Sequence, residues 1–108
     1  MNEPFFLNAL YPDLDDCREI ATIFLEAARI DYAHLRLASE QTEFETIVQL
    51  AHRIKGAAAM VGLVDLAAEA ATLQEIAKRE GCVKEQICLL EHTLERMIAE
   101  TSQWLADS

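Results

Sequence analysis

The spacing of apolar residues between positions 44 and 61 is the feature that most constrains how this chain can fold. Apolar side chains recur there at alternating intervals of three and four: Phe44, Ile47, Ala51, Ile54, Ala58 and Val61. This spacing places them on one side of an α-helix, where they form a seam that packs against other helices. The segment is therefore predicted to be a helix over about residues 42–61, ended by Gly62.

Three other segments carry the same kind of seam. They run over about residues 15–39, from about residue 65 to Gly81, and over about residues 83–105. The seam residues are Cys17, Ala21, Phe24, Ala28, Leu35 and Ala38, then Leu66, Ala70, Leu73 and Ala77, then Val83, Ile87, Leu90, Leu94, Met97 and Thr101. The connections are short, so consecutive helices must run antiparallel.

The predicted fold is all-α: an antiparallel up-down-up-down four-helix bundle over residues 15–105, preceded by a short N-terminal helix or lid over residues 1–14. No linker, repeat or low-complexity segment divides the chain, so residues 1–108 are expected to form a single domain. Only 3 Gly and 2 Pro occur in 108 residues, which fits a helical chain with few turns.

Charge and cysteine content exclude several classes of function. The net charge of −10 disfavours binding to nucleic acid or to an anionic membrane, and no stretch approaches the ~18 apolar residues of a membrane span. The 3 cysteines have no CxxC spacing, so we expect free thiols rather than disulfides or a zinc site. Free thiols are typical of a reducing cytoplasm, where we expect the chain to be a monomer without membrane insertion.

The stretch AHRIKGAAAMV, residues 51–61, contains the candidate reactive group. His52 follows the seam residue Ala51 and is therefore rotated about 100° away from the core, towards a flank of the bundle or solvent. Lys55 shares that flank, and the small residues Gly56 and Ala59 come next. Glycine inside a helix costs about 0.8–1.0 kcal/mol relative to alanine, so its presence indicates a close approach, either by another helix of the bundle or by a partner protein. Because His52 lies off the core seam, the partner protein is the preferred explanation.

Polar groups on the next helix are expected to face the histidine. If the chain reverses near residue 63, His52 lies opposite Gln74, with Lys78 one turn beyond, and Arg53 adds charge nearby. Cations beside an imidazole disfavour its protonation and stabilise an anion at the ring, which suits a phosphoryl group. We find no second acid–base residue, metal-ligand cluster or phosphate-binding glycine loop, so another protein must supply half of the chemistry.

These residues resemble the signature of histidine phosphotransfer (HPt) domains of bacterial multistep phosphorelays. The motif H-x-x-K-G is present as His52, Lys55 and Gly56, and it is followed by the alanines 57–59 and by Gly62. Many members have a serine or another small polar residue at the position of Ala57, so this chain lacks that possible hydroxyl hydrogen bond.

The resemblance implies specific roles. His52 would accept a phosphoryl group on Nε2 from a receiver-domain aspartate and pass it to another. The phosphate would be oriented by Lys55, Gln74 and Lys78, and the receiver would dock on Val48, Arg53, Gly56, Ala59 and Gly62.

Partners and cofactors are implied in the same way. The partners would be the receiver domains of a hybrid sensor kinase and of a downstream response regulator. Mg²⁺ would belong to the receiver, so the chain itself would bind no metal or other cofactor. It would act as a phosphoryl carrier without ATP-dependent kinase activity, either alone or as the cytoplasmic C-terminal module of a membrane-bound hybrid kinase.

Other classes of helical protein explain less of the sequence. A non-catalytic adaptor bundle would account for the seams but not for the bare surface beside His52. The dimerisation domain of a sensor kinase typically has an acidic residue after its histidine and a later proline, whereas this chain has Arg53 and no such proline. A di-metal bundle would need paired Glu and E-x-x-H elements, which are missing. His34 and His92 lack comparable neighbours and are interpreted as ordinary, partly exposed histidines.

Overall fold

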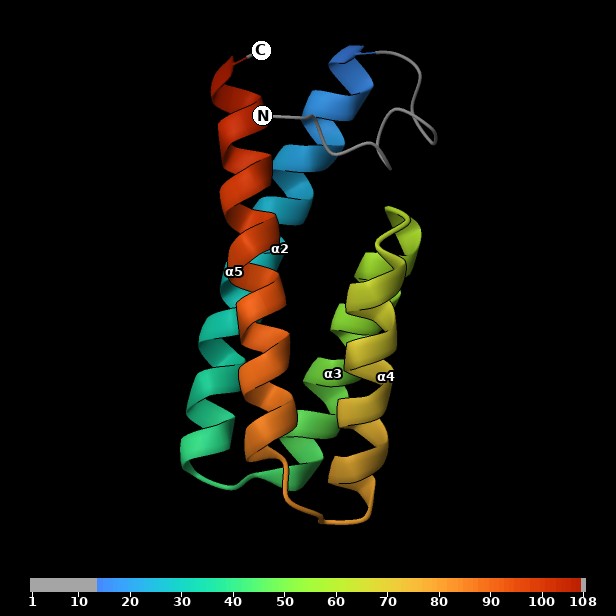
Figure 1. Cartoon of the computed structure of the whole chain (residues 1–108), viewed down its shortest axis with the longest axis vertical. Coiled ribbons are helices and arrows are strands. Elements are labelled where there is room, and N and C mark those ends of the chain that lie inside the picture. The colour runs from blue at the N-terminus through green and yellow to red at the C-terminus, as the bar shows by residue number, and fades with distance from the viewer. Residues whose placement is uncertain (1–13, 108) are drawn as a thin grey trace.

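The computed structural model describes residues 14–107, which form four helices joined by short turns (Figure 1). The helices are α2 (Leu14–Glu40), α3 (Phe44–Met60), α4 (Val64–Lys78) and α5 (Lys84–Asp107). Their ends lie within three residues of the predicted bounds, and the largest difference is at α4, which ends at Lys78 rather than at Gly81. The lid expected over residues 1–14 lies outside the described residues except for Leu14, which already belongs to α2.

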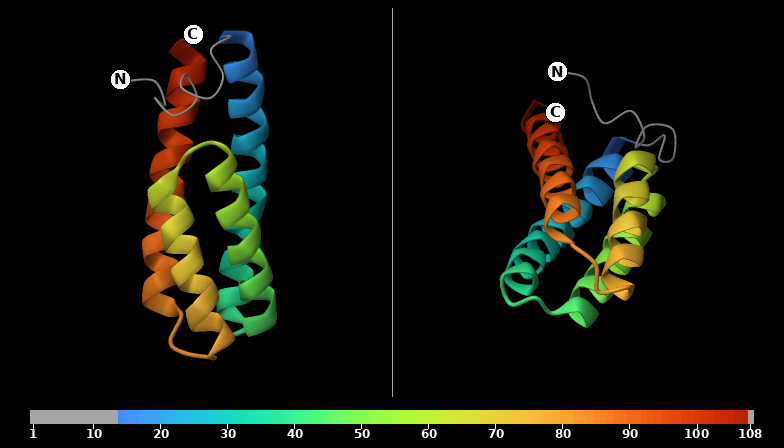
Figure 2. Two further views of the ribbon diagram at one scale, coloured as in Figure 1. Left: turned by 90° about the vertical axis from the view of Figure 1, so that its right-hand side faces the viewer. Right: turned by 60° about the horizontal axis from the view of Figure 1, so that its bottom comes forward.

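The helices form the predicted antiparallel four-helix bundle. Each helix packs against two neighbours, and the α3–α4 pair has the largest contact (Figure 2). The first and last described helices are the longer ones: α2 and α5 contain 27 and 24 residues, whereas α3 and α4 contain 17 and 15. Because a helix rises about 1.5 Å per residue, α2 and α5 extend beyond the turn that joins α3 to α4.

The core consists of the predicted seams, since nearly every seam residue is buried. The two exceptions are Phe44 and Met97, which are half-buried and pack against the edge of the core. The bundle also buries Leu50 and Thr93, which lie one position from seam residues. Burial of so many apolar side chains is the main favourable contribution to stability. It also makes α3 a rigid support for the exposed side chains on its outer surface.

The turn between α3 and α4 depends on a left-handed residue. Gly62 has φ of 78°, and its N–H donates to the carbonyl of Ala59 at 3.2 Å. The N–H of Leu63 donates to the carbonyl of Ala58 at 2.9 Å. These two bonds close the helix with a Schellman motif, in which glycine avoids the strain that a Cβ would introduce. At the end of α4, the left-handed residue is Glu80, with φ of 54°, rather than the expected Gly81.

The end of α2 offers a stabilising substitution, because its left-handed residue is the β-branched Thr42, with φ of 53°. Thr42→Gly is expected to raise the free energy of unfolding by about 0.5–1 kcal/mol, since the strain removed exceeds the added chain entropy. Thermal or denaturant unfolding measures the change. Thr72 is an exposed threonine inside α4, and Thr72→Gly is expected to lower stability by about 0.5 kcal/mol. Equal effects of the two substitutions would contradict this interpretation.

Candidate functional site

His52 lies on the outer surface of α3. Its side chain is exposed, while the preceding Ala51 is fully buried in the seam. The difference follows from the rotation of about 100° between consecutive helical residues. Within residues 14–107 the imidazole forms no hydrogen bond or ion pair, so no described residue occupies either ring nitrogen.

The two flanks of α3 carry different cations. Arg53 reaches α2, where its Nε donates a hydrogen bond to Oδ1 of Asp31 at 3.0 Å. Lys55 lies about 200° further around the helix, so it is on the opposite flank, facing α4. Val48, seven residues earlier, shares that flank, and both side chains are half-buried. His52 therefore points outward between a cation on the α2 side and a cation on the α4 side.

Gln74 lies on the side of α4 that faces α3. Glu69 lies on the opposite side of α4, which faces α5, because its carboxylate accepts a hydrogen bond from Thr93 of α5. His52 and Gln74 are about 15 and 18 Å from Gly62 when measured along their helices, so they lie at similar levels. Gln74 is half-buried and forms no hydrogen bond within the described residues, which leaves its amide available to a group bound between the two helices.

The cations expected around His52 are only partly brought together. Lys78 lies one turn beyond Gln74, and its Nζ is 3.4 Å from a carboxylate oxygen of Glu75, with both side chains exposed. Arg53 is paired with Asp31, and these hydrogen bonds, followed by the charge of the carboxylate, raise the pKa of Arg53. Lys55 forms no ion pair with any residue between 14 and 107. The positive charge least compensated near the ring is therefore that of Lys55.

The surface beyond His52 is bare, as the sequence predicts. Gly56 is exposed in the interior of α3, and a Cβ placed on it would meet no atom within 4 Å. The fold itself therefore does not require glycine at this position. Ala59 is exposed one turn further on, next to Met60, which is 72% exposed. Gly62, also expected on the docking surface, is half-buried and has the structural role of ending α3.

Two features near the site were missed by the sequence analysis. The first is Asp31, which is only 5% exposed and occupies the seam position between Ala28 and Leu35. An acidic residue in an apolar seam was a signal that could have identified it, because a buried carboxylate needs a partner. The second is Met60, which the sequence analysis did not single out, although its position off the seam, between Ala58 and Val61, places it on the outer side of the helix.

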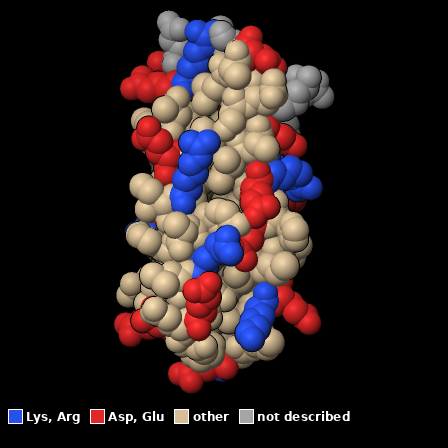
Figure 3. All heavy atoms as spheres, turned by 90° about the vertical axis from the view of Figure 1, so that its left-hand side faces the viewer, with Lys and Arg blue, Asp and Glu red and all other residues tan. Residues whose placement is uncertain are grey.

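The face formed by α2 and α5 is a separate, mixed-charge surface. Basic and acidic side chains intermingle there (Figure 3). The contacts include a hydrogen bond from the Tyr32 hydroxyl to Glu95 and an ion pair of 3.7 Å between Arg36 and Glu91. The bond to Glu95 raises the pKa of Tyr32, and burial raises the pKa of Glu91. These contacts join the two long helices, and they lie on the flank of α2 that faces away from α3.

No set of three or more His, Cys, Asp or Glu side chains within residues 14–107 is arranged to hold a metal ion. None of the helices in this part of the chain is both long and apolar enough to cross a lipid bilayer.

Comparison with known families gives one match, to the Hpt domain, over residues 19–104. No curated protein and no solved structure matches the chain significantly. The matched region includes the H-x-x-K-G motif, the exposed histidine and nearly all of the four helices. Because the match covers most of the 108 residues, the chain belongs to the Hpt domain family.

Proposed function

We propose that this chain carries a phosphoryl group on His52 between the aspartates of two receiver domains in a phosphorelay. Family membership supports a role in phosphotransfer. The observation that carries the finer proposal is the exposed imidazole of His52 on a rigid helix, beside a surface without side chains at Gly56. A receiver must bring its aspartyl phosphate close to the ring, and this surface has room for that approach.

The transfer needs only one bond to form and one to break. Nε2 of neutral His52 attacks the phosphorus of an aspartyl phosphate, the N–P bond forms, and the bond from phosphorus to the carboxylate oxygen breaks. The released aspartate keeps the bonding electrons, and the proton on Nδ1 stays on the ring. The second receiver reverses these events with its own aspartate. Phosphoryl transfer of this kind depends mainly on positioning and on compensation of charge.

Three polar residues around His52 are proposed to orient the phosphoryl oxygens. Lys55 is the best placed, because it lies one turn from His52 and has no carboxylate partner among the described residues. Gln74 would donate from the adjacent helix. Lys78 would contribute after leaving Glu75, and separating such an exposed ion pair costs less than about 1 kcal/mol.

The receiver is proposed to dock across α3 and the neighbouring edge of α4. Val48, Gly56 and Ala59 provide small or apolar contacts, and Arg53 provides a charged contact at the rim. Mg²⁺, where the transfer uses it, would be held by the receiver together with its acidic residues. We propose that the two receivers belong to a hybrid sensor kinase and to a downstream regulator.

The test is transfer of radiolabelled phosphate from a phosphorylated receiver to the purified chain. We expect label on the chain, stable in alkali and lost in acid as phosphohistidine is, and located in the peptide that contains His52. Return of the label to a second, unphosphorylated receiver would establish the relay. Binding of the receiver without any label on the chain would contradict the proposal and would favour an adaptor bundle.

A further inference from the structure

Asp31 is a buried carboxylate that the bundle does not need for packing. It occupies a seam position of α2 and is 5% exposed, alongside Ala28, Ile54 and Ala57. The other seam residues of α2 are apolar or, at Cys17, a small thiol. A buried carboxylate is expensive unless it is paired, and apolar replacements of buried ion pairs are often as stable as the originals. Stability alone therefore does not explain an acidic residue here.

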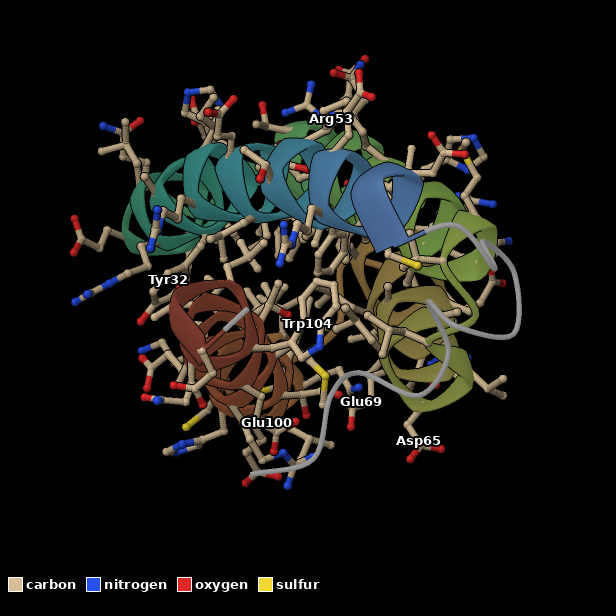
Figure 4. The ribbon with its side chains drawn as sticks, turned by 90° about the horizontal axis from the view of Figure 1, so that it is seen from above. Tyr32, Arg53, Asp65, Glu69, Glu100 and Trp104 are labelled. Carbon is tan, nitrogen blue, oxygen red and sulfur yellow. The ribbon has the colours of Figure 1, made fainter. Side chains whose placement is uncertain are left out.

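The partner of Asp31 is Arg53, the residue that follows His52. Both Nε and Nη2 of the guanidinium donate to the same oxygen, Oδ1, of Asp31. Arg53 nevertheless remains 58% exposed, and Figure 4 shows it at the outer rim of the bundle beside α2. A guanidinium has five N–H donors, so most of them remain free on its solvent side. Asp31 thus holds an exposed cation in one orientation.

This fixed cation lies beside the reactive ring. Arg53 is one residue from His52, about 100° around α3 and about 1.5 Å along it. Lys55 lies on the other flank, so the two cations border the ring from opposite sides. A receiver that reaches His52 must pass close to the guanidinium, and an oxygen atom at the edge of the receiver's acidic pocket could accept its free N–H groups.

We propose that Asp31 is a positioning residue for docking: it orients Arg53 so that the guanidinium binds an acidic or carbonyl oxygen at the edge of the receiver's phosphorylation site. The role requires His52 to be the phosphoacceptor, so it rests on the proposed function. Removing Asp31 has two opposite consequences for docking. Arg53 gains uncompensated charge, but its long side chain loses its fixed geometry. We expect the lost orientation of Arg53 to affect docking more than its gained charge. Salt screens the long-range attraction of that charge, whereas a short hydrogen bond depends on direction.

The experiment compares Asp31→Leu with the native chain in single-turnover transfer from a phosphorylated receiver. Leucine suits the apolar seam, so the variant is expected to unfold at the same denaturant concentration or a higher one. The receiver concentration that gives the half-maximal rate is expected to rise about tenfold, typical of the loss of one charge-assisted hydrogen bond, while the rate at saturation stays unchanged. A merely structural Asp31 would leave the half-saturating concentration unchanged in a stable variant.

Asp31→Asn serves as a second variant of nearly unchanged size, and a smaller rise is expected for it, because the amide oxygen still accepts from the guanidinium but without the charge. Arg53→Met is expected to have a similar effect, and adding it to Asp31→Leu should change little further, because both act through one contact. The half-saturating concentration is expected to depend less strongly on salt in Arg53→Met than in the native chain, because that variant lacks the cation at the contact. Arg36→Met removes an exposed arginine on the α5 side of α2 and is the matched control, with no expected effect on transfer.

The outcomes separate this inference from the proposed function. If the native chain accepts no phosphoryl group at all, the proposed function fails. If the native chain accepts it and Asp31→Leu has the native half-saturating concentration, or a lower one, the positioning role is overturned while the proposed function stands. A lower value would mean that the freed charge of Arg53 matters more than its orientation.

Discussion

Replacing His52 with glutamine is expected to reduce phosphoryl acceptance at least about a thousandfold, down to background, because the chemical step loses its nucleophile. Glutamine preserves polarity and length but has no ring nitrogen with a nucleophilic lone pair. His52 is exposed and forms no contact that the bundle needs, so the free energy of unfolding is expected to change by less than about 0.5 kcal/mol. Label transfer and denaturant unfolding are measured on the same preparation.

The chain contains its own matched controls for this substitution. His34 on α2 and His92 on α5 are also exposed histidines within helices. His34→Gln and His92→Gln are expected to transfer phosphate at the native rate. Equal loss of transfer in all three variants would point to a general effect of histidine removal, and undiminished transfer by His52→Gln would place the phosphoacceptor elsewhere.

The fold could be predicted from the sequence because its seams repeat with little interruption. Residues such as Ala51, Ile54 and Ala58 are buried where the helical period places them. The exposure of His52 follows from the same period, since His52 lies about 100° around the helix from Ala51, on the side away from the other seam residues. Periodicity determines which way a residue faces, and this was enough to predict the bundle and the bare surface around Gly56.

Pairing between side chains could not be predicted in the same way. Arg53 was expected to add charge near His52, and the sequence did not indicate that it pairs with Asp31 of α2. Lys78 was expected one turn beyond Gln74, and its exposed side chain pairs with Glu75 on its own helix. The period gives the direction of each residue, whereas pairing depends on how two helices are rotated and shifted against each other and on which rotamers of long side chains meet.

The side-chain contacts that join the helices lie away from the surface of α3 that is proposed for docking. Contacts that join α2 to α5, such as Tyr32–Glu95, lie on one flank of α2, and Asp31 on the other flank reaches α3. The outer surface of α3 at His52 and Gly56 takes no part in these contacts. Substitutions on this surface can therefore change docking without changing the fold, which makes stability and transfer separable measurements.

Substitutions at Gly56 are expected to separate stability from phosphoryl transfer most clearly. A Cβ at this position would meet no atom within 4 Å, so Gly56→Ala is expected to raise the free energy of unfolding by about 0.8–1.0 kcal/mol through helix propensity alone. Gly56→Leu is expected to keep most of this gain, because leucine also favours helix. The larger side chain would nevertheless occupy the space into which a receiver moves in the proposed function.

We therefore expect Gly56→Leu to lower the rate of phosphoryl transfer about a hundredfold while the protein becomes more stable, a change that corresponds to about 2.7 kcal/mol. Ala99 is an exposed alanine on the outer face of α5, and Ala99→Leu is the matched control, with transfer expected at the native rate. Native transfer by Gly56→Leu would mean that no partner approaches this surface. A stable but inactive Gly56→Leu would instead show that glycine is kept for docking, since the fold alone favours a larger residue at this position.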